Sequence, residues 1–372
     1  MIDKKRLCKE FAEMVQIDSP SFGERRMADY VKEKLTALGF RVEEDRAGER
    51  YGSDTGNVYG FLKGTVPGTP ILLSAHLDTA GPALGKKAVL HADGRITGAG
   101  DTVLGADDLA GVVQILEGIR HLQEERIPHR DVEILFSIAE EVYIKGAESF
   151  DFGKIRAKEA YVLDLSGTPG TAALKAPTLI SFRITVHGRA SHAGFAPEEG
   201  IHALYVMSAA VSRLRLGYID EERDTTLNIG VIKGGSAANI VPDTCVCEGE
   251  IRSFSHKKAL IQTEVLQEIF RRASETAGAD FEMEFHIDLE AYETEKTAPA
   301  VMRFVEACSR LGLPGELTDT FGGSDNNSFA KHGIHGIVLA CGMHKCHSVR
   351  EYTSVQELKL GAELVAELLR HQ

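Results

Sequence analysis

The chain has 372 residues, of which 43% are hydrophobic and 26% charged. This is an ordinary globular composition with room for one large domain or two smaller ones. The formal net charge of -13 argues against a surface that binds nucleic acid or anionic membrane, because such a surface carries excess positive charge.

Neither a membrane span nor a secretory signal is expected. No apolar run approaches the roughly 20 residues that cross a bilayer, and the N-terminal MIDKKRLCKEFAEMV predicts an amphipathic helix without an unbroken apolar stretch. The six cysteines are scattered and form no CxxC pair, which favours reduced thiols over zinc-binding cysteines. We therefore expect a cytoplasmic protein.

Helices and strands alternate in the first half of the chain, as in a layered α/β domain. Apolar spacing predicts helices over about residues 3–16, 24–38 and 107–126. Strands are expected in FRVEEDR, NVYGFLKG, PILLSAHL and AYVLDLSG and over residues 131–139.

The pattern changes near residue 178. In LISFRITVHG apolar and polar residues alternate, which is typical of a half-buried strand in an antiparallel sheet. A helix at about 198–216, strands near 226–233 and 245–254, a helix at 257–277 and the alternating FEMEFHIDL follow. This β-α-β-β-α-β order predicts an inserted α+β domain, ferredoxin-like, with a four-stranded antiparallel sheet and two helices.

The predicted fold class is therefore α/β, with a central mixed sheet between helices and an inserted α+β domain. Residues 1–176 and 291–372 would form the first domain and residues 177–290 the insertion. The boundaries fall in SGTPGTAALKAPT and EAYETEKTAPA. After residue 290 we expect helices, a short strand GIVLACG and a final helix from Ser354.

Polar residues recur where predicted strands end or helices begin. His76 and Asp78 flank Leu77 at the end of one strand, so imidazole and carboxylate point the same way. The others are Asp107 and Asp108 at a helix start, Glu140 and Glu141 after a strand, Asp164 at another strand end and His347 in a late loop. Taken singly, each also fits a capping, salt-bridged or solvated role.

Together, His, Asp, Glu, Asp and His form a nitrogen and oxygen set suited to zinc, with cobalt or manganese as substitutes. Five ligands exceed what one tetrahedral zinc uses, so a pair of ions sharing one carboxylate fits better. A dication would also hold the adjacent Glu140 and Glu141, which otherwise repel each other. One of them would bind metal and the other would act as a base.

The series SAHLDT, GADDLAG, AEEVYIKGA, VLD, GRASHAG, GGSDNN and CHSVREYTSVQEL resembles a family of di-zinc metallopeptidases. This family includes peptidase T, aminoacylase and carboxypeptidase G, and the similarity is to its peptidase T-like (tripeptide aminopeptidase-like) branch. It covers nearly the whole chain. It implies that the first domain is the catalytic di-metal domain and that the insertion is a lid that also mediates dimerisation.

The resemblance implies two zinc ions and their ligands. His76 and Asp164 would bind one ion, Glu141 and His347 the other, and Asp107 would bridge them.

The resemblance also implies roles around these ligands. Asp78 would orient His76, and Glu140 would be the general base that takes a proton from the metal-bridging water. A cis peptide is implied between Asp107 and Asp108.

Further residues are implied for binding the substrate. His192 in GRASHAG would polarise the scissile carbonyl, and in dimeric relatives it reaches the active site of the neighbouring subunit. Asn239 and Arg252 would anchor the substrate, since a guanidinium suits a terminal carboxylate. Gly323 in GGSDNN would offer backbone contacts. An ordinary turn or strand role stays open for His192 and Arg252.

The implied activity is hydrolysis of small peptides by a homodimer that pairs through the lid. An Asp at the position of Asp164 accompanies aminopeptidases and dipeptidases in this family, whereas deacylases and carboxypeptidases tend to have Glu. We therefore expect removal of the N-terminal residue from tripeptides or similar peptides. The alternatives are a dipeptidase, an N-acyl amino acid amidohydrolase and a non-catalytic metal- or peptide-binding homologue.

Overall fold

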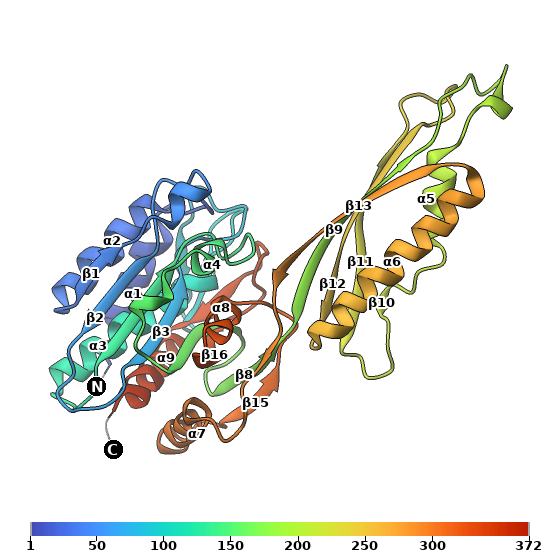
Figure 1. Ribbon diagram of the computed structural model, residues 1–372. Helices are drawn as coiled ribbons and strands as arrows, with labels where there is room; N and C mark the ends of the chain where they lie inside the picture. The colour runs from blue at the N-terminus through green and yellow to red at the C-terminus, as the bar shows by residue number, and fades with distance from the viewer. Residues whose placement is uncertain (1, 371–372) are drawn as a thin grey trace. The chain divides into compact units, whose positions relative to one another are not determined.

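The computed structural model describes residues 2–370. The chain divides into two compact units (Figure 1). Unit 1 comprises Met1–Lys175 and Glu293–Gln372, and unit 2 comprises Ala176–Tyr292. None of the helices within residues 2–370 is long and apolar enough to cross a membrane.

Unit 1 is built on a mixed sheet whose strand order is β1-β2-β6-β3-β7-β16-β8-β14, with β15 paired to β8. The strands are β1 Arg41–Glu44, β2 Val58–Leu62, β3 Ile71–His76, β6 Val132–Ser137, β7 Glu159–Ser166, β8 Thr171–Ala176, β14 Tyr292–Glu293, β15 Glu316–Asp319 and β16 His335–Met343. Strand β3 runs parallel to β6 and β7, and β16 runs parallel to β7. The carboxyl ends of these four strands therefore meet at one edge of the sheet.

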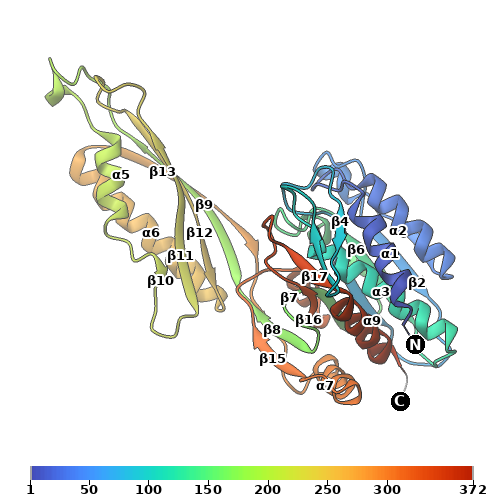
Figure 2. The ribbon, with the colours of Figure 1, turned by 180° about the vertical axis from the view of Figure 1, so that it is seen from behind.

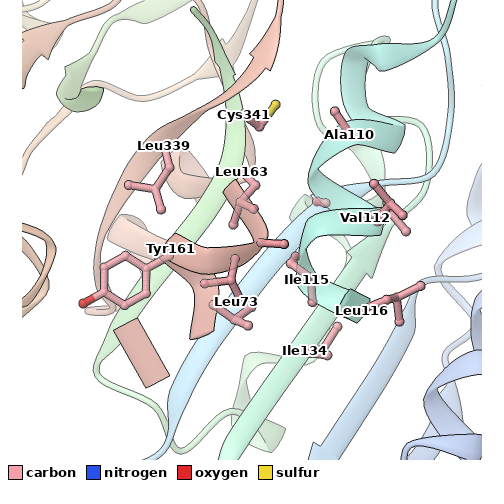
Figure 3. Packing of buried hydrophobic residues seen from close by; sticks show 14 of the residues in the cluster. Leu73, Ala110, Val112, Ile115, Leu116, Ile134, Tyr161, Leu163, Leu339 and Cys341 are labelled. Atoms are coloured by element: carbon pink, nitrogen blue, oxygen red, sulfur yellow. The ribbon is translucent and has the colours of Figure 1, made fainter. Parts of the chain in front are cut away.

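Helices cover both faces of this sheet. The helices of unit 1 are α1 Lys4–Val15, α2 Arg25–Ala37, α3 Ala106–Glu124, α4 Lys145–Glu148, α7 Pro299–Leu311, α8 Asp325–Lys331 and α9 Val355–Leu369, with 3-10 turns at Ala47–Arg50 and Phe152–Lys154. Figure 3 shows Ile115 of α3 on the side of the helix that faces Leu73 of β3 and Leu163 of β7, and all three belong to one apolar cluster. Leu72, the neighbour of Leu73, belongs to a second cluster with Phe329 of α8. Successive strand residues thus face opposite helical layers, which explains the continuous apolar runs.

A small sheet, order β17-β5-β4, completes unit 1 and was not predicted. Its strands are β4 Ala88–Leu90, β5 Arg95–Gly98 and β17 Tyr352–Ser354. Figure 2 shows β4 and β17 from behind, and both views place the start of α1 near the end of α9. Part of SGTPGTAALKAPT, where the sequence suggested a domain boundary, forms β8.

Unit 2 is an antiparallel sheet of order β10-β11-β12-β9-β13. Its elements are β9 Thr178–His187, a 3-10 turn Pro197–Glu199, α5 Ala203–Val211, β10 Gly217–Tyr218, β11 Thr225–Gly234, β12 Thr244–Ser253, α6 His256–Ala277 and β13 Asp280–Leu289. The alternating residues Ile180, Phe182 and Ile184 pack with Val206 of α5 and Phe270 of α6 in one core. The predicted fold class is confirmed, with the two-residue strand β10 added to the four expected strands.

One predicted helix is shorter in the structure. The sequence suggested a helix over about 198–216, but α5 spans only Ala203–Val211. Ile201 instead pairs with Arg189 in an antiparallel bridge, and the ring of His202 caps the helix by accepting from the Tyr205 N–H. The backbone before Ala203 is therefore held extended by a partner distant in sequence.

Candidate metal centre

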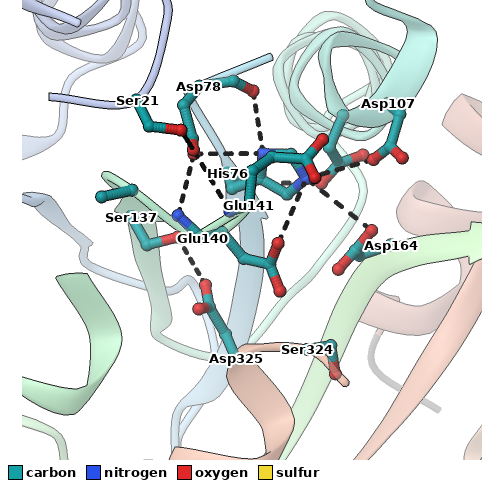
Figure 4. A network of polar contacts seen from close by, with 12 residues as sticks. Ser21, His76, Asp78, Asp107, Ser137, Glu140, Glu141, Asp164, Ser324 and Asp325 are labelled. Atoms are coloured by element: carbon teal, nitrogen blue, oxygen red, sulfur yellow. Dashed lines mark hydrogen bonds and ion pairs between the residues drawn. The ribbon is translucent and has the colours of Figure 1, made fainter. Parts of the chain in front are cut away.

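The parallel strands of unit 1 bring the predicted residues to one edge of the sheet. His76 is the last residue of β3, and Asp164 lies near the end of β7. Glu140 and Glu141 follow β6, whose Ser137 is paired in register with His76. These side chains converge because parallel neighbours end on the same side (Figure 4).

His76 lies at the centre of this group and is only 1% exposed. Its Nε2 atom is 3.1 Å from Asp107 Oδ1, 3.8 Å from Asp164 Oδ1 and 3.9 Å from Glu140 Oε2. Three carboxylates from three different elements thus surround one imidazole nitrogen.

Asp107 lies between two imidazoles. Its Oδ1 faces His76, and its Oδ2 is 3.1 Å from Nε2 of His347. The same His347 nitrogen is 3.0 Å from Glu141 Oε2. A carboxylate that directs one oxygen to each histidine has the arrangement expected of a ligand shared by two ions.

Asp78 links His76 to the backbone of the two glutamates. Its carboxylate accepts hydrogen bonds from the N–H groups of Glu140 at 3.0 Å and Glu141 at 3.2 Å, and from Ser21 Oγ at 2.6 Å (Figure 4). The Nδ1 atom of His76 lies 2.9 Å from the Asp78 carbonyl oxygen and 3.4 Å from its carboxylate. An Nδ1–H donated to these oxygens leaves Nε2 free to bind a cation.

The start of α3 is held by two buried carboxylates. The peptide between Asp107 and Asp108 is cis, as the resemblance implied. Asp108 accepts from the N–H groups of His76 at 3.1 Å and Gly111 at 3.2 Å. Glu351 accepts from the Asp107 N–H at 2.9 Å. Asp108 therefore accepts hydrogen bonds at the start of the helix, which is the capping role that the sequence allowed for both aspartates. The side chain of Asp107 instead faces the two histidines.

Two more buried acids support the segment after β6. Glu24 accepts a hydrogen bond from the Ala139 N–H at 2.9 Å, directly before Glu140. Asp325, at the start of α8, accepts from Ser137 Oγ at 2.5 Å, while its Oδ1 atom is buried and has no hydrogen-bond partner in the described part of the chain. Burial raises the pKa of Glu24 to about 7, with a further contribution from the charge of Asp78.

The pKa values of the cluster reflect an excess of negative charge. Burial raises the pKa of Glu140 well above its usual value, and the charge of Asp164 adds to the rise. Burial also opposes ionisation of Asp107, but hydrogen bonds from His347 and His76 outweigh it and hold its pKa below the usual range. The bonds to Asp107 and Glu141 raise the pKa of His347 to about 11. Added positive charge would therefore be stabilised here.

The donors fit metal ions. Ligand atoms of His76, Asp107 and Glu141 lie within 4.8 Å of one another, and so do those of His76, Glu140 and Asp164. The Glu141 Oε1 atom is buried and has no hydrogen-bond partner among residues 2–370, which is costly unless a cation binds it. Nitrogen and oxygen donors of this kind suit zinc, cobalt or manganese.

The other predicted residues belong to other segments of the chain. Gly323 lies two residues before α8. His192 and Asn239 belong to unit 2, where the Ala193 N–H donates to the Asn239 carbonyl and exposed His192 stacks on Phe195.

Arg252 lies on β12 of unit 2. Its Nε atom donates to Glu250 at 2.9 Å, and a second nitrogen donates to the other oxygen of the same carboxylate at 3.1 Å. The arginine is therefore in an ion pair on its own strand.

Sequence reasoning missed the supporting acids Glu24 and Glu351. Both bind backbone N–H groups more than 100 residues away in the chain. Glu24 immediately precedes α2 and reads as an ordinary acidic residue at a helix start. No pattern in the neighbouring sequence distinguishes these two buried acids from the many acidic residues that are exposed to solvent.

Comparison with known proteins gives matches along the whole chain. The family described as Peptidase dimerisation domain (M20_dimer) matches residues 174–280, and Peptidase family M28 matches residues 57–190. Uncharacterized protein YqjE of Bacillus subtilis (strain 168) is 36% identical over 369 residues, which cover 99% of each chain.

Two solved structures are also similar over the full length. A tripeptidase from Staphylococcus aureus subsp. aureus Mu50 has a TM-score of 0.96 and 32% identity, covering 99% of this chain and 98% of that one. The aminopeptidase PepT from Bacillus cereus ATCC 10987 has a TM-score of 0.92 and 34% identity, with the same coverage of both chains.

Proposed function

This chain belongs to the M20 family of metallopeptidases, within its peptidase T-like members, and on that premise we propose that it removes the N-terminal residue from tripeptides and similar small peptides. The observation that carries the proposal is the position of Asp107, between His76 and His347, with the half-buried Glu140 beside them. The similarity to a tripeptidase and to an aminopeptidase over the full length supports the choice of substrate.

Five residues would hold two metal ions, with zinc as the first candidate and cobalt or manganese as substitutes. They are His76, Asp107, Glu141, Asp164 and His347, with Asp107 shared between the ions. The unpartnered oxygen of Glu141 and the negative charge of the cluster support this assignment. When bound, the ions supply positive charge that polarises the scissile carbonyl and acidifies water.

Glu140 is the proposed general base. Its Oε2 would accept a proton from the attacking water and pass it to the nitrogen of the departing amine. The Asp78 carboxylate, bound to the Glu140 N–H, would keep the base in place, and it would orient His76 through Nδ1.

Unit 2 would complete the site and pair two subunits into a homodimer, in line with its match to a peptidase dimerisation domain. His192 would stabilise negative charge developing on the scissile carbonyl oxygen. Arg252 would release Glu250 and bind the terminal carboxylate of the peptide substrate. Asn239 and the backbone at Gly323 would orient the peptide.

The test is hydrolysis by purified protein supplied with zinc, together with elemental analysis of metal per chain. The substrates are Leu-Gly-Gly, Leu-Gly and N-acetyl-leucine. We expect release of leucine from the tripeptide at the highest kcat/KM. Faster cleavage of the dipeptide would indicate a dipeptidase, and cleavage of N-acetyl-leucine alone an amidohydrolase. Metal binding without any hydrolysis would favour a binding protein.

A further inference from the structure

A cavity of about 690 Å³ lies beside the candidate metal centre, within unit 1. Glu141 and His347 form part of its wall. The rest of the wall is made by residues 79–84 together with Pro20, Ser21 and Val142. The cavity is thus continuous with two residues proposed to bind metal, and its volume is in the range of small-ligand sites.

The wall is mostly apolar. Among the described residues that line it, the ionisable ones are Glu141 and His347, and both are assigned to the metal centre. The remaining lining residues include two prolines, two alanines and a valine, and Leu84 contributes a side chain that is 69% exposed. Because Glu141 and His347 already face each other at 3.0 Å, a charged group placed here would find no free partner of opposite charge, whereas an apolar group would be stabilised by burial.

Hydrogen bonds tie the two sides of the cavity together. The Thr79 N–H donates to the Ser19 carbonyl at 2.9 Å, and the Gly85 N–H donates to Asp18 Oδ1 at 2.7 Å. Behind the wall, the buried Lys86 donates from Nζ to Thr79 Oγ1 at 2.9 Å. These bonds fix the segment 79–85 against residues 18–21, so the cavity exists before any ligand binds.

The same wall is connected to the reacting groups. Ser21, which lines the cavity, donates to Asp78, and Asp78 accepts from the backbone of Glu140. A group in the cavity therefore lies next to the position where the scissile bond must be held.

We propose that this cavity binds an apolar side chain of the peptide, belonging to one of the two residues that flank the scissile bond. The inference rests on the proposed peptidase activity and adds a substrate class to it, namely small peptides with leucine-like or aromatic side chains. Leu84, at the rim, would contact this side chain and help to set the preference.

The test compares kcat/KM for two peptide series, X-Gly-Gly and Gly-X-Gly, in which X is leucine, glycine, lysine or glutamate. We expect the leucine peptide of one series to exceed its lysine and glutamate counterparts by roughly 10-fold to 100-fold. Leu84→Ala should lower kcat/KM for that leucine peptide roughly fivefold or more, and change Gly-Gly-Gly by less than about twofold.

Leu90→Ala is the matched control. Leu90 lies on β4, is 59% exposed and does not line the cavity, so its loss should leave all ratios unchanged. Leu84→Lys should reverse part of the preference, lowering the rate for leucine and raising it for glutamate, whereas Leu90→Lys should not.

Equal rates for leucine and charged peptides in both series would overturn the inference while leaving the peptidase activity intact. So would a Leu84→Ala variant with the same ratios as Leu90→Ala. Absence of cleavage of every peptide by the wild-type protein would instead contradict the proposed function, and the inference would fall with it.

Discussion

The carboxylate of Asp78 accepts a hydrogen bond from the backbone N–H of Glu140 at 3.0 Å, while it lies 3.4 Å from Nδ1 of His76. One buried side chain thus positions both the proposed base and a proposed metal ligand. Asp78 itself does not belong to either of the groups whose ligand atoms lie within 4.8 Å of one another.

Asp78→Asn should weaken metal binding and activity together. The amide keeps the size of the side chain but replaces one acceptor oxygen with a donor, which opposes the N–H group of either Glu140 or Glu141, because these donate to different oxygens of Asp78. We expect metal affinity or turnover to fall by roughly 10-fold to 100-fold. Competition with a coloured chelator would measure affinity, and wild-type affinity and kcat in this variant would contradict the positioning role.

Glu140→Gln should retain metal and lose turnover. The amide cannot accept a proton, so kcat should fall by roughly 100-fold to 10,000-fold, while elemental analysis finds the same metal per chain. Glu148→Gln is the matched control, because Glu148 is an exposed glutamate on the nearby α4. A Glu140→Gln enzyme as fast as the control would refute the assignment of the base.

Glu24 should make the stability of the protein depend on pH. Burial raises its pKa to about 7 in the folded protein, above the ordinary 4.5. Between pH 4.5 and pH 7, Glu24 is therefore protonated to a greater extent in the folded state than in the unfolded state. The stabilisation of the folded state that results from this proton is lost as the pH rises through about 7. The free energy of unfolding of the wild type, relative to Glu24→Gln, should fall by about 3 kcal/mol from pH 4.5 to pH 8.

Denaturant unfolding of both proteins at several pH values measures this difference. The amide of Glu24→Gln can still accept from the Ala139 N–H, so the comparison isolates the titration. A difference that stays constant over the whole range would show that folding does not raise the pKa of Glu24.

The sequence predicted the elements of this fold where the pattern is local. The apolar run ending at His76 and the alternation of Ile180, Phe182 and Ile184 each identified a strand. A strand buried on both faces is a continuous apolar run, and a strand buried on one face alternates apolar with polar residues. The convergence of the strand-end residues followed from the parallel order. Their roles as ligands and base stay predictions.

Other parts of the structure could not be read from the chain. The start of α5 depends on the pairing of Ile201 with Arg189. The backbone N–H of Ala139 is held by a hydrogen bond to the side chain of Glu24. In both cases a backbone group finds a partner distant in sequence, and backbone groups are the same in every residue. The side chains therefore carry no local signal of these contacts.

The proposed dimer can be tested by complementation between two inactive variants. If His192 acts on the site of the partner subunit, a heterodimer of His192→Ala and Glu140→Gln contains one complete site. That site combines Glu140 of the first chain with His192 of the partner subunit. We expect the heterodimer, isolated with two different affinity tags, to have about half the wild-type rate.

Each variant alone should be nearly inactive, since every site in its homodimer lacks one of the two groups. If His192 instead served the site of its own chain, neither site of the heterodimer would be complete, and mixing would restore nothing. Light scattering of the wild-type protein completes the test, because a monomer in solution would contradict pairing through unit 2.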